Sequence, residues 1–139
     1  MTISTNSINH IRLTVTDIDR SRAFYEALFA WPVAIEMPAD TPAAEQGRFD
    51  FLYGGVIYNI GHSLLGLRPV AKDAFSEDRT GLDHLSLTVD SLDELTAAVV
   101  LLEKAGVAHS GIKDIGEANI LEFRDPDNIA LELFAAKTQ

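Results

Sequence analysis

Two histidines and one glutamate have the types and the spacing of a metal-binding set. When the sequence is aligned with itself at an offset of 74 residues (84 − 10), His10 aligns with His84. Each histidine begins a stretch in which apolar residues occupy every second position. Glu132 lies between two leucines in a third alternating stretch. A buried carboxylate without a partner costs several kcal/mol, so Glu132 requires a cation or a hydrogen-bond donor. Two histidines and one carboxylate on a shared face suit Fe²⁺, Mn²⁺ or a similar ion.

Each of these residues also has a plain structural interpretation. A single histidine on a strand is often only a satisfied polar residue, and an ancestral duplication would preserve both histidines without any function. The coincidence of His10 with His84, together with the independent placement of Glu132, favours the metal site. We predict that His10, His84 and Glu132 hold a divalent metal ion, with Fe²⁺ as the first expectation and Mn²⁺, Zn²⁺ or Ni²⁺ as alternatives.

The repeat predicts the elements that position these residues. Each copy begins with an alternating strand and continues into a helix, capped by Asp17 or Asp19 in the first copy and by Ser91 in the second. The apolar side of each first strand is expected to pack on its helix, which leaves the histidines on the opposite side. Further strands are expected at residues 33–37, 49–53, 56–60 and 62–68, then at 108–112, 119–123 and 129–134, with an irregular loop at 38–47.

The predicted fold class is α+β, with two tandem βαβββ modules whose curved mixed sheets surround a cavity. Module 1 spans about residues 6–70 and module 2 about residues 81–136, within one domain of residues 1–139. The length suits a single domain with its own core.

Composition excludes several classes of function. The chain carries 21 Asp+Glu against 11 Lys+Arg, a formal charge of −10, so nucleic acid and anionic membrane surfaces are not expected as partners. There is no cysteine, which excludes disulfides, thiolate metal sites and cysteine nucleophiles. No stretch approaches the about 18 apolar residues of a membrane span, and the first ten residues lack the pattern of a signal peptide. We expect a cytoplasmic protein that acts on a small molecule.

Four segments together resemble the vicinal oxygen chelate superfamily, at residues 9–15, 24–29, 82–89 and 123–133. This superfamily includes glyoxalase I, bleomycin-resistance proteins, fosfomycin-resistance enzymes and extradiol ring-cleaving dioxygenases. The resemblance implies paired βαβββ modules, a homodimer, and metal-ligand positions on the first and last strand of each module. Those positions are His10, Gly66, His84 and Glu132. Glyoxalase I has a carboxylate where Gly66 stands, so glycine there is expected to leave room for substrate or water.

The resemblance also suggests a proton-transfer residue. His62, followed by Ser63 and Leu64, is similar to the acid/base histidine of the extradiol dioxygenases. Two alternatives stay open: His62 lies on the strand face beside Gly66, or it is a solvated residue of a hairpin turn. Glu122 stands where those dioxygenases have a tyrosine. His109 is a second candidate for proton transfer, and the candidate wall residues of the substrate site are Tyr58, Asn59, Arg12, Arg68 and Phe123.

The expected function is that of a metal-dependent enzyme acting on a small substrate with vicinal oxygens. Its His, His, Glu set is most similar to that of the Fe²⁺ extradiol dioxygenases. The alternatives are a glyoxalase-like lyase or isomerase and a non-catalytic small-molecule binding protein of the bleomycin-resistance type. Because all three ligand-type residues are present, an enzyme is favoured over a binding protein.

Overall fold

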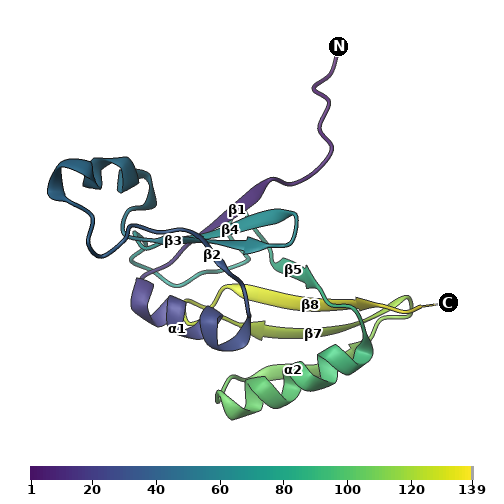
Figure 1. Ribbon diagram of the computed structural model, residues 1–139. Coiled ribbons are helices and arrows are strands. Elements are labelled where there is room, and N and C mark those ends of the chain that lie inside the picture. Colours follow the sequence, from purple (N-terminus) through teal and green to yellow (C-terminus); the bar gives the residue numbers. More distant parts are fainter. Residues whose placement is uncertain (139) are drawn as a thin grey trace. The chain divides into compact units, whose positions relative to one another are not determined.

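The computed structural model describes residues 1–138 and divides the chain into two compact units (Figure 1). Unit 1 is Met1–Lys72, and unit 2 begins at Asp73. Each unit contains a four-stranded mixed sheet and a helix in the order βαβββ, so the predicted α+β fold class with two βαβββ modules is confirmed. No helix among residues 1–138 has both the length and the apolar character needed to cross a membrane.

Unit 1 contains a sheet with the strand order β1-β4-β3-β2. Strand β1 pairs in parallel with β4, and the other pairs are antiparallel. Helix α1 begins after Asp17, whose carboxylate accepts a hydrogen bond from the backbone N–H of Arg20 at 3.0 Å, so Asp17 rather than Asp19 is the cap. The elements are β1 (His10–Thr14), α1 (Ile18–Leu28), β2 (Val33–Ile35), the 3₁₀ segment η1 (Ala43–Leu52), β3 (Val56–Ile60) and β4 (Ser63–Arg68).

Unit 2 repeats this topology with the strand order β5-β8-β7-β6. Strand β5 pairs in parallel with β8, while β7 pairs antiparallel with both β8 and β6. Helix α2 begins after Ser91, as predicted, because its hydroxyl accepts a hydrogen bond from the backbone N–H of Glu94. The elements are β5 (Leu85–Thr88), α2 (Leu92–Lys104), β6 (His109–Asp114), β7 (Ala118–Arg124) and β8 (Ala130–Ala136).

The apolar sides of the central strands form the core. In β1 and the residue after it, Leu13 and Val15 are buried while Ile11 is half-buried. In β8, Leu131 and Leu133 are buried and alternate with the half-buried Glu132. The period of two therefore separates an inner side from a polar side of the sheet.

The predicted strand at residues 49–53 is wrong. These residues belong to η1 and the residue that follows it, and they pair with no other strand. The alternation predicted the wrong structure because Phe49 and Phe51 follow it without being buried. Leu52, which the alternation places on the opposite side with Asp50, enters the core instead. Tyr53 ends η1 in the left-handed region with φ 53°, a conformation incompatible with a continuing strand. The predicted loop at 38–47 is likewise helical from Ala43 onward.

Candidate metal centre

His84 and Glu132 share a cavity of about 330 Å³ in unit 2. His84 comes directly before β5, and Glu132 projects from β8, its parallel neighbour. This cavity, called the unit 2 cavity below, is lined by Glu77, Asp83, His84, Ala108, Glu122, Phe123, Arg124, Ala130, Leu131 and Glu132. The structure therefore brings together two of the three predicted ligands.

The imidazole of His84 is held at one nitrogen and open at the other. Nδ1 lies 2.7 Å from Asp83 Oδ1, and because a carboxylate only accepts, the Nδ1–H donates. Nε2 lies 3.9 Å from Glu132 Oε2. The hydrogen bond to Asp83, followed by the charge of Glu132, raises the pKa of His84 above its ordinary value. This is the arrangement of a metal-ligating histidine, in which an acceptor at one nitrogen orients the lone pair of the other.

Glu132 is oriented in a similar way. Its side chain is 13% exposed, and Oε1 accepts a hydrogen bond from Ser86 Oγ at 2.6 Å, which leaves Oε2 facing His84. In the sheet, Glu132 is flanked by Ser86 on β5 and Glu122 on β7. Glu122 is paired with Lys113 at 2.6 Å.

The two free atoms are close enough to contact one divalent ion, although neighbouring ligands in tetrahedral or octahedral sites are about 3.0–3.4 Å apart. Two donors, each about 2.1 Å from one ion, are at most about 4.2 Å apart. The 3.9 Å between His84 Nε2 and Glu132 Oε2 lies within that limit. An anionic oxygen beside a neutral imidazole nitrogen is also the donor pair that Fe²⁺, Mn²⁺ and Zn²⁺ accept.

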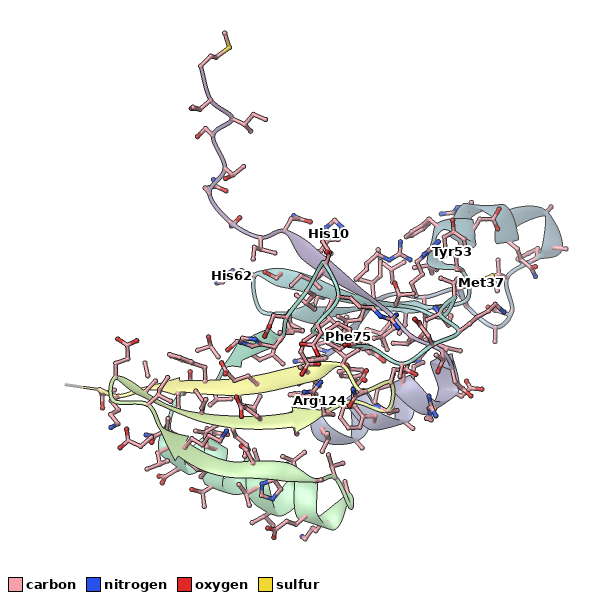
Figure 2. All side chains as sticks on the ribbon, turned by 180° about the vertical axis from the view of Figure 1, so that it is seen from behind. His10, Met37, Tyr53, His62, Phe75 and Arg124 are labelled. Carbon is pink, nitrogen blue, oxygen red and sulfur yellow. The ribbon has the colours of Figure 1, made fainter. Side chains whose placement is uncertain are left out.

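His10, the third predicted ligand, shows the same arrangement in unit 1. Its Nδ1 lies 2.7 Å from Asn9 Oδ1, the same separation as between His84 and Asp83. The imidazole is exposed at the start of β1 (Figure 2). It belongs to a pocket of about 300 Å³, called the unit 1 pocket below and lined by Asn9, His10, Arg12, Phe51, Ile57, Leu64 and Gly66.

Neither unit by itself holds a complete metal site. Within each unit, the described residues contain no group of three His, Cys, Asp or Glu side chains placed to bind a metal. His84 and Glu132 lie in unit 2, and His10 lies in unit 1. The assignment of these three residues to one ion therefore stays a prediction.

Gly66 lines the unit 1 pocket, and the Arg12 side chain fills part of the space beside it. A Cβ built on Gly66 would lie 3.0 Å from Arg12 Cγ and 3.5 Å from Arg12 Nε, so the Arg12 side chain occupies the volume beside this glycine. Arg12 is directly across from Gly66 in the β1–β4 pair. The sequence reasoning treated Arg12 and Gly66 separately and missed this contact.

His62 lies in the turn between β3 and β4 and is exposed (Figure 2). The preceding Gly61 has φ +73°, which makes the connection a tight hairpin turn. Of the two alternatives for His62, the structure therefore places it in the turn. His109 is half-buried, and its Nδ1 accepts the backbone N–H of Gly111 while Nε2 lies 3.4 Å from Glu103.

The candidate wall residues lie in different environments. Tyr58 is 1% exposed, and its hydroxyl donates to Glu26 Oε1 of α1 at 2.8 Å, so its ring lies on the helix side of the sheet. Asn59 is exposed and lies across from Leu64 of the unit 1 pocket. Arg68 is stacked over the ring of Tyr53, with 4.2 Å between the guanidinium carbon and the ring centroid. Phe123 is buried and lines the unit 2 cavity.

Sequence reasoning missed Asp83, Asn9 and Ser86 as supporting residues. The sequence contains a signal for Asn9 and Asp83, because the repeat aligns these two residues with each other, each directly before one of the two histidines. Both side chains offer an oxygen that accepts from Nδ1. Ser86 is two residues after His84 and faces the same side of β5, so its contact with Glu132 follows only when the strand register is known.

The chain matches the family described as the Glyoxalase/Bleomycin resistance protein/Dioxygenase superfamily over residues 7–133. It is 29% identical to the uncharacterized protein YwkD of Bacillus subtilis (strain 168), with 92% of this chain and 95% of that protein covered. A glyoxylase/bleomycin resistance protein/dioxygenase domain from Frankia sp. EAN1pec is 30% identical, with a TM-score of 0.76 over 96% of this chain and 100% of that domain.

A second solved structure is similar in fold. It is a mutant of the fosfomycin resistance protein FosX from Listeria monocytogenes, complexed with Mn(II) and 1S,2S-dihydroxypropylphosphonic acid. This protein is 18% identical, with a TM-score of 0.73 over 96% of this chain and 95% of that chain.

Proposed function

Because the chain belongs to the glyoxalase/bleomycin resistance protein/dioxygenase superfamily, we propose that it is a metal-dependent enzyme whose divalent ion is held by His10, His84 and Glu132. The observation that carries this proposal is the 3.9 Å between His84 Nε2 and Glu132 Oε2, with the remaining nitrogen and oxygen held by Asp83 and Ser86. The Mn(II) bound by the FosX relative supports an ion of this kind. Fe²⁺ is the first expectation, and Mn²⁺, Zn²⁺ and Ni²⁺ are the alternatives.

The proposed substrate is a small molecule with two adjacent oxygens. When bound, the ion supplies Lewis acidity that stabilises negative charge developing on those oxygens. The compound bound by the FosX relative carries two adjacent hydroxyl groups, which supports this substrate class. In this chain, Asp83 fixes the ring of His84, and Ser86 fixes the carboxylate of Glu132.

Two reaction types suit this ligand set. The His, His, Glu combination is that of an extradiol dioxygenase, with His62 as the proposed proton-transfer residue. A lyase or isomerase is the second candidate, and the position of Glu122 in the unit 2 cavity favours it. This carboxylate lies directly across from Glu132 and lines the same cavity. Its Oε2 accepts from Lys113 Nζ at 2.6 Å, so Oε1 is the oxygen proposed to accept a proton from a substrate.

Metal content tests the proposal most simply. The purified protein is loaded anaerobically with Fe²⁺, Mn²⁺, Zn²⁺ or Ni²⁺, desalted, and analysed for bound metal. We expect near-stoichiometric binding, lost in His84→Ala and Glu132→Ala. His62→Ala and His109→Ala are matched controls, because each removes an imidazole that is not among the proposed metal ligands. Equal metal content in all four variants, or no bound metal in the native protein, would contradict the proposal.

Two assays separate the reaction types. Oxygen uptake with a panel of catechols on the Fe²⁺-loaded protein reports dioxygenase activity. Deuterium exchange into hydroxyacetone on the Mn²⁺-loaded protein reports proton abstraction beside a carbonyl. For lyase or isomerase chemistry, Glu122→Gln is expected to lose exchange while it still binds metal. If Glu122→Gln exchanges deuterium as fast as the native protein, Glu122 is not the base.

A homodimer is part of the proposal, with His10 supplied by the same chain or by the second copy. Solution mass tests the dimer. Mixed dimers of a His10→Ala chain and a His84→Ala chain distinguish the two arrangements. A site shared between copies leaves one intact site in each mixed dimer, whereas a site within one chain leaves none. A monomeric mass would contradict the dimer.

A further inference from the structure

Arg12 is a cation that lines the unit 1 pocket and has no carboxylate partner among the described residues. Its Nη2 donates to the backbone carbonyl of Phe51 at 2.7 Å, while Nε is buried and has no hydrogen-bond partner. A buried N–H without an acceptor costs about 1–3 kcal/mol, and more for a charged group. Because protein atoms cover Nε, the groups that can meet a ligand are the N–H groups at Nη1 and Nη2.

No carboxylate forms an ion pair with Arg12 among residues 1–138, although the chain is strongly acidic. Arg22, Arg79 and Arg124 each pair with a carboxylate at 2.6 to 2.9 Å. Arg12 instead lies across Gly66, and a side chain at that position would collide with its stem. The absence of a side chain at Gly66 therefore leaves the space in which Arg12 lies, and no acidic side chain stands at this position.

The two units place opposite charges in corresponding rows of their sheets. In unit 2, the row across β5, β8 and β7 consists of Ser86, Glu132 and Glu122. In unit 1, the row across β1, β4 and β3 consists of Arg12, Gly66 and Ile57. Unit 2 thus presents the carboxylate of Glu132 beside the Lys113-paired Glu122, which suits a cation, and unit 1 presents one guanidinium, which suits an anion.

We propose that Arg12 binds the carboxylate of an organic anion whose apolar part lies against Phe51, Ile57 and Leu64. The guanidinium offers the N–H groups of Nη1 and the second N–H of Nη2 as a planar fork, which matches the two oxygens of a carboxylate. The pocket volume of about 300 Å³ suits a small aromatic or branched acid. This inference deepens the proposed function and rests on it, because His10 lines the same pocket. The substrate class becomes a small carboxylic acid.

Benzoate is the probe, titrated against the full-length protein in the presence of a chelator and followed by NMR or calorimetry. We expect binding with a Kd of about 1 mM or tighter. Arg12→Gln is expected to weaken it at least about tenfold, with partial recovery in Arg12→Lys. Arg48→Gln is the matched control, because it removes an exposed arginine from the same unit. Gly66→Glu is expected to abolish binding, since it supplies Arg12 with its own carboxylate.

Three results would overturn the inference: no binding of benzoate, equal binding of the neutral benzamide, or unchanged binding in a folded Arg12→Gln variant. Phenylphosphonate is a second anion, and tighter binding of it than of benzoate would overturn the carboxylate assignment. The chelator separates this test from that of the proposed function. Benzoate binding in a protein that takes up no metal refutes the metal site alone, and metal uptake without benzoate binding refutes the Arg12 site alone.

Discussion

Ser86→Ala tests whether Ser86 orients Glu132 for a metal. The hydroxyl of Ser86 donates to Glu132 Oε1 at 2.6 Å, a short bond to a charged acceptor. Such bonds contribute about 1.5–3 kcal/mol. The Glu132 side chain is only 13% exposed, so water replaces only part of the lost bond. At about 1.4 kcal/mol for each factor of ten, metal affinity is expected to fall by about 10-fold to 100-fold.

The assay is competition for Zn²⁺ against a chromophoric chelator. Ser86→Thr keeps a hydroxyl and is expected to bind within about threefold of the native protein, because a threonine Oγ reaches the same acceptor. Ser63→Ala is the control, since it removes a hydroxyl that donates to a backbone carbonyl in unit 1. The reasoning is refuted if Ser86→Ala binds Zn²⁺ as tightly as Ser63→Ala while Glu132→Ala has lost it.

Three further predictions concern the fold and its charges. Gly55→Ala places a Cβ 1.8 Å from the backbone carbonyl oxygen of Leu67 on the neighbouring strand. The free energy of unfolding in denaturant is therefore expected to fall by about 3 kcal/mol. An unchanged unfolding midpoint would contradict this packing. Tyr58→Phe removes the 2.8 Å bond to the half-exposed Glu26 and is expected to cost about 1 kcal/mol in the same assay, whereas no loss would mean that the bond contributes nothing. The hydrogen bond from Arg124 lowers the pKa of Glu77 from 4.5 to about 2. This pair therefore stabilises the fold above pH 4.5, and its contribution is lost as the pH falls toward 2. An NMR titration is expected to show the low pKa of Glu77 in the native protein and a pKa near 4.5 in Arg124→Gln.

Local periodicity was sufficient to predict the parts of the fold in which one side of a strand is buried. The alternation around Leu13 and around Leu131 survives in the structure because those strands have one inner and one polar side. Residues 49–53 show the same alternation, but only Leu52 is buried, and the turn chemistry at Tyr53 determines the outcome. Pattern alone does not distinguish these cases, because burial depends on partners distant in the sequence.

The same limit applies to the candidate site. The residue types and the repeat placed His84 and Glu132 on one side of their sheet, and the structure finds them in one cavity. The contact between Arg12 and Gly66 depends on the register of β1 against β4, which a parallel pair separated by a long connection does not reveal in its sequence. Spacing therefore indicated the ligands of unit 2 but not the cation of unit 1.

The most direct measurement of the metal site is a Zn²⁺ titration of the apoprotein followed by the ring ¹⁵N resonances of its four histidines. The Nε2 resonances of His10 and His84 are expected to shift together, and both shifts are expected to be complete at one equivalent of Zn²⁺. The shifts are expected at Nε2 because the Nδ1 atoms are held by Asn9 and Asp83. The resonances of the other two histidines are expected to stay in place. Shifts at Nδ1, or shifts of His84 without His10, would contradict a single ion held by both units.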